Sequence, residues 1–468
     1  MFTLADPQFN GIYRAVTGDG VGDFEAFLAC PPTATLIASG SIVRSAPVDG
    51  IRRELLLAGR PAAPLLLEHE RVPFPSYPTE WPPEMLHAAA ALTLELARVF
   101  LPHRIGLKDA TPYNVLFRGP RPVFIDVLSF ERRDPGDSMW APYGQFLRTF
   151  LLPLLANRRL HMPLDHIFAT RRDGLEPEEV LHWTPPLKRL LPTFLSLVTL
   201  PAWLGARRNQ DDDSVYNQRI LPDPEKARYI LDALFRRLEK LLAAVAPTTD
   251  RKSAWSGYLV SNNNYSKAHF AEKEALVRDA LAGYAPRRVL DIGCNTGHFS
   301  VLAAQFGADV TAIDYDPVVI GALWRRALFE NLPILPLVVN LSRPTPAAGW
   351  DNRETPSFLE RARGHFDAVF MLALIHHLLI TERIPLDSIL DLAARFVSQS
   401  AIGIALIEFI APEDSMFRRL VRGRGDLYGH LTREYFETAV RRRFDIVRTQ
   451  HGDGAHRWLY LLRRKTLV

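Results

Sequence analysis

The chain has 468 residues, more than one ordinary globular core accommodates, so its length favours two or three domains. Apolar residues make up 47% and charged residues 23%, as in folded globular proteins, which excludes extensive disorder. The formal net charge of +4 is spread over 56 basic and 52 acidic residues, so we do not expect nucleic acid as a partner. The composition does not specify an oligomeric state.

Cysteine content and apolar segments bear on the cellular compartment. The two cysteines, Cys30 and Cys294, are too few for a disulfide framework and lack metal-ligand spacing, which favours a reducing cytoplasm. Residues 1–16 lack the basic start and apolar core of a signal peptide, so we do not expect secretion. The most apolar window, Leu190–Leu204, is too short to span a bilayer, which needs about 20 apolar residues. Two prolines interrupt it, and we expect a buried helix rather than a membrane-surface segment.

Composition and pattern divide the chain into three parts, residues 1–160, 161–250 and 251–468. The first mixes short β-like runs with a helical stretch at Pro83–Phe100, which predicts an α+β domain. The second has helical periodicity, most clearly at Glu225–Ala244, and predicts a helical connector that ends in a linker at Val245–Ser253. The β-like runs of the first part are Thr35–Val43, Pro64–Glu68, Val115–Arg118 and Val123–Val127.

In the third part, short apolar strands alternate with helical patterns. Repeated βα units predict a parallel sheet covered by helices, and the last two strands predict a hairpin at the sheet edge. The fold class is therefore α/β, with a Rossmann-like sheet of seven strands after the α+β domain and the connector. The expected strands are Arg288–Ile292, Asp309–Ile313, Ile334–Asn340, Phe366–Leu372, Ile402–Phe409, Phe444–Gln450 and Arg457–Arg463.

A loop with two glycines follows the first of these strands, in the sequence Asp-Ile-Gly-Cys-Asn-Thr-Gly from 291 to 297. Glycines at 293 and 297 let the backbone turn sharply and approach a ligand closely, at the strand end where open α/β sheets bind ligands. A dinucleotide fingerprint would place glycines at the third and sixth positions from Gly293, but these are Asn295 and His298. The dinucleotide interpretation is therefore disfavoured.

The pattern Asp-x-Gly-x-x-x-Gly, with the acid at the strand end, resembles motif I of class I S-adenosylmethionine-dependent methyltransferases. Asp314 ends the second strand, where a carboxylate can accept hydrogen bonds from two ribose hydroxyls, and Asn340 replaces the usual Asp near the adenine amino group. The alternative is a generic βαβ turn with unrelated surface acids. The resemblance implies S-adenosylmethionine as cofactor, with contacts from Asp291, Gly293, Asn295, Gly297, Asp314, Asn340 and Leu372.

The fourth strand is followed by His376 and His377, where small-molecule methyltransferases carry a similar histidine. Methyl transfer is an in-line displacement that depends mainly on positioning, but a hydroxyl or protonated amine acceptor must also lose a proton. Imidazole can take it near neutral pH, so either histidine is a candidate base. The alternative is that one histidine lies beneath the cofactor and the other faces solvent. Candidate substrate ligands are Tyr265, Lys267 and Glu408.

The N-terminal part carries a second constellation. Asp109, Asn114 and Asp126 have the spacing of the kinase catalytic-loop Asp, its metal-binding Asn and the metal-binding Asp of the next strand, so they are candidates to bind Mg-ATP. No Gly-rich phosphate loop precedes them. The nearest substitutes for the strand lysine and helix glutamate of kinases, Arg44 and Glu54, are closely spaced. This part therefore resembles a degenerate kinase-like domain, and substrate recognition is favoured over phosphotransfer.

Across nearly its whole length the chain resembles a bacterial group of two-part proteins that includes the rhizobial NoeA-type nodulation proteins. The Leu-Lys-Asp-Ala-x-x-Tyr-Asn segment and the Asp-x-Gly-Cys-Asn-Thr-Gly loop carry this resemblance. We expect a cytoplasmic enzyme that transfers a methyl group to oxygen or nitrogen, rather than carbon, of a small-molecule or carrier-bound acceptor. Two alternatives stay open: a kinase-like phosphotransferase fused to a methyltransferase and acting on a saccharide-like hydroxyl, and a noncatalytic adaptor that binds the cofactor without turnover.

Overall fold

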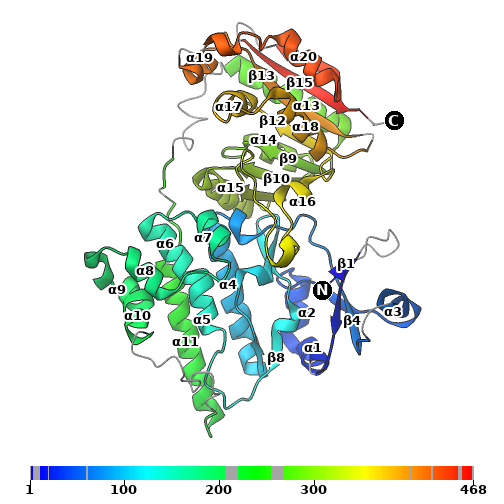
Figure 1. The fold of residues 1–468 in the computed structure, drawn as a ribbon. Coiled ribbons are helices and arrows are strands. Elements are labelled where there is room, and N and C mark those ends of the chain that lie inside the picture. Colours follow the sequence, from blue (N-terminus) through cyan, green and yellow to red (C-terminus); the bar gives the residue numbers. More distant parts are fainter. Residues whose placement is uncertain are drawn as a thin grey trace. The chain divides into compact units, whose positions relative to one another are not determined.

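The computed structural model describes residues 2–3, 11–18, 20–58, 62–205, 220–249, 251–253, 267–400, 402–422, 425–451 and 456–465. It divides into two compact units. The first comprises Met1–Thr79 and Pro83–Thr248, and the second Glu80–Pro82 and Thr249–Val468 (Figure 1). The helical stretch that the sequence assigned to a separate connector is thus part of the first unit.

The first unit combines a four-stranded antiparallel sheet, in the order β1-β2-β4-β3, with two two-stranded sheets and many helices. Its strands are β1 Phe2–Thr3, β2 Ile12–Val16, β3 Ser45–Pro47, β4 Leu65–His69, β5 Ile105–Leu107, β6 Val115–Arg118, β7 Arg121–Phe124 and β8 Phe130–Arg132. Its α-helices are α1 Gly20–Ala29, α2 Pro31–Ala38, α3 Gly50–Leu57, α4 Pro83–Phe100, α5 Tyr143–Phe146, α6 Leu152–Leu160, α7 Leu164–Thr170, α8 Pro177–Trp183, α9 Pro192–Phe194, α10 Leu200–Gly205 and α11 Pro224–Ala244.

Helix α4 is the central helix of the first unit. Its Ala- and Leu-rich sequence agrees with the predicted range, and α11, in which Leu231, Phe235 and Leu238 are buried, packs against it. This packing is why the predicted connector is not separate. The stretch Pro83–His103 has the length and hydropathy of a membrane span, but 61% of its apolar window is buried inside the structure. That burial is the pattern of a core helix.

Two expectations for the first unit were wrong. The run Thr35–Val43 was expected as β structure, but its first residues belong to α2. Prolines at the start of α2 preset the backbone for the first helical turn, and the following residues continue the helix. The window Leu190–Leu204 was expected to be buried, but several of its leucines and Trp203 are exposed.

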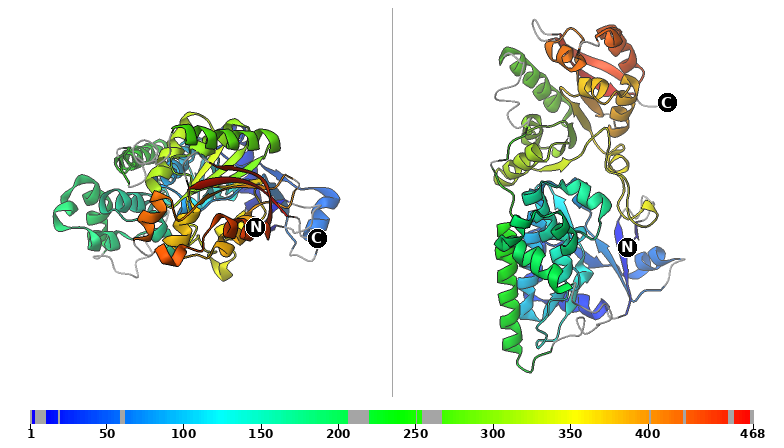
Figure 2. Two further views of the ribbon diagram at one scale, coloured as in Figure 1. Left: turned by 90° about the horizontal axis from the view of Figure 1, so that it is seen from above. Right: turned by 60° about the vertical axis from the view of Figure 1, so that its left-hand side comes forward.

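The second unit is an α/β Rossmann-like fold with a mixed seven-stranded sheet, in the order β11-β10-β9-β12-β13-β15-β14. Helices flank the sheet on both sides (Figure 2). The strands are β9 Arg288–Ile292, β10 Asp309–Asp314, β11 Ile334–Val338, β12 Ala368–Met371, β13 Ile404–Ile410, β14 Phe444–His451 and β15 Arg457–Arg464. The α-helices are α13 Lys267–Tyr284, α14 His298–Gln305, α15 Pro317–Phe329, α16 Phe358–Ala362, α17 Ile375–Ile380, α18 Leu386–Phe396, α19 Ser415–Val421 and α20 Arg433–Arg441.

Each strand of this sheet overlaps a range expected from the sequence. Strands β9 to β13 are parallel to one another, because helices connect them and return the chain to the same edge. The predicted hairpin is also present, with β15 antiparallel to both β13 and β14. The carboxyl ends of the parallel strands therefore meet at one edge, where the predicted ligand site lies.

Candidate functional site

The loop after β9 lies at the centre of the sheet's carboxyl edge. In the strand register, Ile292 is opposite Ile313 of β10 on one side and Met371 of β12 on the other. The backbone amides of Gly293 and Cys294 both donate to the carbonyl oxygen of Ile313, at 2.8 and 3.1 Å. The loop is therefore held over the end of β10, between the two strands that carry the other predicted site residues.

The glycines of this loop are required by its geometry. Gly293 and Gly297 have φ angles of +72° and +81°, and a Cβ at position 297 would lie 2.3 Å from Cδ1 of Leu323. Asn295, in place of the commoner central glycine, also has a positive φ of 52°. Its side-chain oxygen accepts the amide of Thr296 at 2.7 Å. Asparagine tolerates this left-handed conformation better than most residues, which explains why the substitution preserves the loop.

Two carboxylates hold the loop from opposite sides. Asp291 is buried and accepts the Ser300 hydroxyl at 2.6 Å, which ties the strand end to α14. Asp314 accepts the backbone amides of Asn295 and Asp316, at 3.1 and 3.0 Å. Burial raises the pKa of both carboxyl groups to about 6. Asp314 is only partly buried, so it is the more accessible of the two.

The remaining predicted cofactor ligands lie at the ends of β11 and β12. Asn340 follows β11, and its side-chain oxygen accepts both the amide and the hydroxyl of Ser342, at 3.0 and 2.6 Å. Both of its lone pairs are thereby occupied, so a bond to an adenine amino group requires the hydroxyl of Ser342 to turn away. Leu372 directly follows β12 and is 8% exposed, as part of the apolar core of the unit.

The two candidate base histidines lie at the start of α17, directly after β12. Their ring centroids are 4.2 Å apart. His376 is buried, and its Nδ1 has no hydrogen-bond partner among the residues that the structure describes. Burial, together with the charges of His377, Arg457 and Lys273, holds the pKa of His376 well below its usual range. Burial also lowers the pKa of His377, so both imidazoles are neutral at pH 7.

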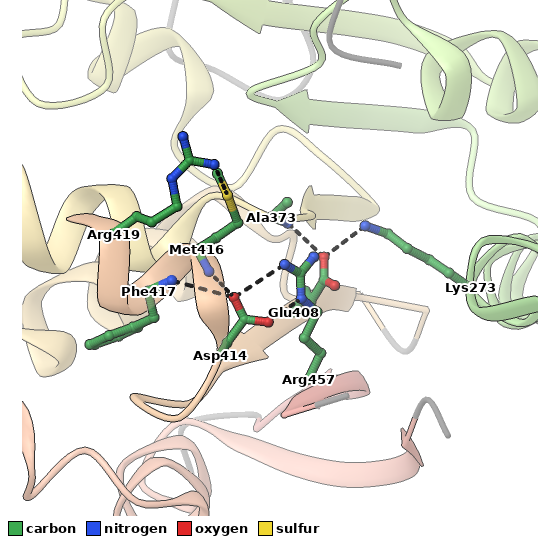
Figure 3. A network of polar contacts seen from close by, with 8 residues as sticks. All are labelled: Lys273, Ala373, Glu408, Asp414, Met416, Phe417, Arg419 and Arg457. Atoms are coloured by element: carbon green, nitrogen blue, oxygen red, sulfur yellow. Dashed lines mark hydrogen bonds and ion pairs between the residues drawn. The ribbon is translucent and has the colours of Figure 1, made fainter. Parts of the chain in front are cut away.

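A buried ion pair supports the turn between β12 and these histidines (Figure 3). Lys273 of α13 lies 2.7 Å from the Glu408 carboxylate on β13, and these side chains are 5% and 1% exposed. The same carboxylate oxygen accepts the backbone amide of Ala373 at 2.8 Å. Ala373 has a φ of +54°, a conformation that costs an L-residue about 1–2 kcal/mol. Glu408, predicted as a substrate ligand, instead contacts the protein interior.

A second buried ion pair lies beside the first (Figure 3). The guanidinium of Arg457, on β15, binds both carboxylate oxygens of Asp414, at 2.9 and 3.2 Å. Asp414 also accepts the amides of Met416 and Phe417 and so caps α19. Burial alone would raise the pKa of Asp414, but the Arg457 bond and charge and the two amides bring it below its usual range. The antiparallel strand is thereby fixed to the helix after β13.

The predicted substrate ligands before motif I are only partly visible. Tyr265 lies outside the described residues, and Lys267 begins α13 with a side chain that the structure does not describe. Sequence reasoning missed Lys273. The sequence does carry a sign that Lys273 is buried. It precedes the buried Leu276 and Val277 by three and four residues and so lies on the apolar face of α13.

The kinase-like constellation lies within the first unit. Asp109 follows β5, Asn114 ends a 3₁₀ turn at Pro112–Asn114, and Asp126 follows β7. Asp126 forms an ion pair with Arg14 of β2, a partner that sequence reasoning missed. The Asn114 side-chain nitrogen is buried and has no hydrogen-bond partner within the described part of the chain. Among the described residues, no group of three or more His, Cys, Asp or Glu is placed to hold a metal ion.

Comparison with known proteins matches part of the chain to a family and most of the chain to a relative. The family described as "Methyltransferase domain" matches residues 232–419, which include the glycine loop and both histidines. Nodulation protein NoeA of Rhizobium meliloti (strain 1021) is 30% identical over 401 residues, covering 85% of this chain and 82% of NoeA.

Solved structures that resemble the chain are more distant. N-methyltransferase NodS of Bradyrhizobium japonicum WM9, in complex with S-adenosyl-L-homocysteine, is 17% identical over 49% of this chain and 97% of NodS, with a TM-score of 0.32. The bifunctional kinase-methyltransferase WbdD is 17% identical over 46% of this chain and 43% of WbdD, with a TM-score of 0.31.

The arrangement at the sheet edge fits S-adenosylmethionine. The two glycines allow the left-handed turn that follows β9, and Asp314 offers a partly accessible carboxylate at the tip of β10. From the NoeA match and the matched methyltransferase family, the chain belongs to the NoeA-type protein family and is an S-adenosylmethionine-dependent methyltransferase.

Proposed function

We propose that the methyl group is transferred to an oxygen or nitrogen atom of a small-molecule or carrier-bound acceptor, and that His376 or His377 takes the acceptor's proton. The observation that carries this proposal is the neutral imidazole pair after β12, with a buried Nδ1 of His376 that lacks a partner among the described residues. A neutral imidazole can accept a proton from a hydroxyl or an ammonium group. An adaptor without turnover has no use for such a base.

The cofactor supplies an electrophilic methyl group on a sulfonium sulfur when it is bound. We assign the ribose hydroxyls to Asp314 and close backbone contact to Gly293 and Gly297. Asp291 acts through the loop, because its carboxylate is buried against Ser300. Glu408 positions the turn that carries the histidines and does not contact the acceptor, since Lys273 and the Ala373 amide engage it.

The test uses methyl-labelled S-adenosylmethionine with a size-fractionated bacterial extract as the source of acceptors. We expect label in the small-molecule or lipid-soluble fraction, bound to oxygen or nitrogen. Replacing the base, by His376→Gln or His377→Gln, should lower turnover by about 10²- to 10⁴-fold, while calorimetry shows an unchanged affinity for S-adenosylmethionine. Label on a protein side chain, on nucleic acid or on carbon would contradict the proposal, as would full turnover in both variants.

We propose that the first unit recognises the acceptor, with kinase-like phosphotransfer as a second candidate. The order of α4, the Asp109 segment, the β6–β7 hairpin and Asp126 follows the order of a kinase catalytic half, which favours nucleotide binding. Against it, Arg14 neutralises Asp126, so a magnesium ion would have to displace this ion pair. Titration with Mg-ATP separates the two candidates. Binding that is lost in Asp126→Ala supports phosphotransfer, whereas no binding supports recognition.

We also propose the reducing cytoplasm as the compartment of the protein. Cys30 and Cys294 are both free thiols and both buried. Buried thiols of this kind behave as small apolar side chains and need no oxidising environment. We expect that, when the protein is purified without added reductant and then unfolded, both thiols react fully with an alkylating reagent.

A further inference from the structure

A stretch of the first unit exposes an unusual number of large apolar side chains. Residues 185–205 form a 3₁₀ turn at Pro186–Leu190, helix α9, a π-helical turn at Leu195–Thr199 and helix α10, which Figure 1 shows at the margin of the unit. Only four of its large apolar or alanine side chains are buried, namely Phe194, Leu197, Val198 and Ala202. The exposed ones are Leu187 (86%), Leu190 (73%), Leu191 (43%), Leu195 (37%), Leu200 (47%), Trp203 (50%) and Leu204 (56%).

The polar side chains of this stretch point inward, whereas a helix on the surface of a globular protein directs its polar side chains outward. All exposed residues between 185 and 205 are Pro, Leu, Trp or Gly. Lys188 donates to the carbonyl of Arg159 at 3.0 Å, and Arg189 donates to the carbonyl of Thr184 at 2.9 Å. The Ser196 hydroxyl accepts a hydrogen bond from α11. The stretch therefore presents an apolar outer face above a layer of satisfied polar groups.

We propose that this face, residues 185–205, docks reversibly on the surface of an anionic lipid bilayer. Specific protein interfaces make about one hydrogen bond per 100–200 Å², but every polar side chain within this described stretch is buried or half-buried. A bilayer needs no such bonds from an inserted leucine. Helix α10 with the turn before it, Pro192–Gly205, is too short to span the bilayer, so the face lies in the interface. Tryptophan is enriched at that depth.

The charge of the segment also fits an anionic surface. Lys188 and Arg189 are half-buried at the base of the face, where each donates to a backbone carbonyl, and Arg207 and Arg208 follow the face in the sequence. No Asp or Glu occurs from residue 180 to residue 210. Glu179 and Asp211 bound this acid-free region in the sequence, and the Glu178 carboxylate would contact a Cβ at Gly205, at the end of the face. Basic residues beside inserted apolar side chains attract anionic headgroups, which a neutral membrane does not offer.

The test is flotation of the full-length chain with vesicles of phosphatidylcholine and phosphatidylglycerol, compared with phosphatidylcholine alone. We expect binding to the anionic vesicles that weakens with salt. The double variant Leu187→Gln/Leu190→Gln should lower the partition coefficient by at least about tenfold, and Trp203→Gln by a smaller factor. Phe329→Gln, which changes a 91% exposed side chain of the second unit, is the matched control and should bind as the wild type does.

Far-UV circular dichroism and thermal unfolding that match the wild type establish that the variants are folded. The proposal is overturned if the wild type does not bind anionic vesicles, or if the double variant binds as tightly as the wild type. Light scattering adds a further outcome. If the wild type forms a dimer and does not bind vesicles, and if the double variant is a monomer, the face binds a second copy of the chain instead.

Discussion

Removal of the Lys273 ammonium by Lys273→Met is the sharpest test of how the methyltransferase unit is held together. The Glu408 carboxylate is 1% exposed, and Lys273 lies 2.7 Å from it. The variant leaves that charge in the interior without its cationic partner, while the Ala373 amide still donates to it. Breaking a buried pair from one side costs about 3–5 kcal/mol. At roughly 2–4 °C per kcal/mol for a domain of this size, the melting temperature should fall by about 6–20 °C.

Thermal unfolding of the full-length chain, followed by calorimetry, measures this change for the unit that S-adenosylmethionine stabilises. The double variant Lys273→Met/Glu408→Gln is the matched control, because glutamine still offers an oxygen to the Ala373 amide and no charge is left buried. We expect it to recover most of the lost stability. Since the same carboxylate holds the turn before the histidines, the single variant should also weaken cofactor binding, by about tenfold.

Two results would refute this reasoning. One is a melting temperature of Lys273→Met within about 2 °C of the wild type, which would mean that solvent reaches the carboxylate. The other is a double variant no more stable than the single one, which would mean that the lysine contributes by packing rather than by charge.

Three further predictions concern the cofactor loop and the first unit. Affinity for S-adenosylmethionine should fall about tenfold from pH 7 to pH 5, because the pKa of Asp314 is raised to about 6 and only its ionised form accepts two ribose hydroxyls. In calorimetry, Asp314→Asn should bind the cofactor more weakly at pH 7 and show a smaller dependence of affinity on pH. Gly297→Ala should abolish measurable binding, since its Cβ would lie 2.3 Å from Leu323 at a φ of +81°. Arg14→Ala should raise any Mg-ATP affinity of the chain, because it frees Asp126 from its ion pair.

Each of these has a contrary outcome. A profile that stays level from pH 7 to pH 5 in the wild type would mean that Asp314 does not bind the ribose as a carboxylate. If the double variant Gly297→Ala/Leu323→Ala binds S-adenosylmethionine as tightly as the wild type, the contact with Leu323, and not the φ angle, is what requires glycine at position 297. Mg-ATP binding that is absent in both the wild type and Arg14→Ala would remove Asp126 from consideration as a nucleotide ligand.

Local sequence pattern determined the strands and the cofactor loop of the second unit. Strand β9 begins and ends at the residues expected, and the other strands overlap their expected ranges, because an apolar run bounded by turn residues is a local property. The positive φ angles of Gly293 and Gly297 are also local, since they belong to the backbone of one turn, whereas the contact of position 297 with Leu323 is tertiary. In the first unit, local pattern failed at Thr35–Val43, where the prolines at the start of α2 outweighed the β-like residues that follow.

Tertiary structure alone decided what each polar group does. Lys273 and Glu408 are 135 residues apart, and the sequence does not show that they neutralise each other in the core. The burial that makes His376 neutral, and the exposure of Leu200 and Leu204 in α10, depend on which elements pack over them. The physical reason is that the spacing of apolar residues, which predicts helices and strands, is a property of a few neighbouring residues. Charge pairing and solvent exposure depend instead on segments far apart in the sequence, which only the folded chain brings together.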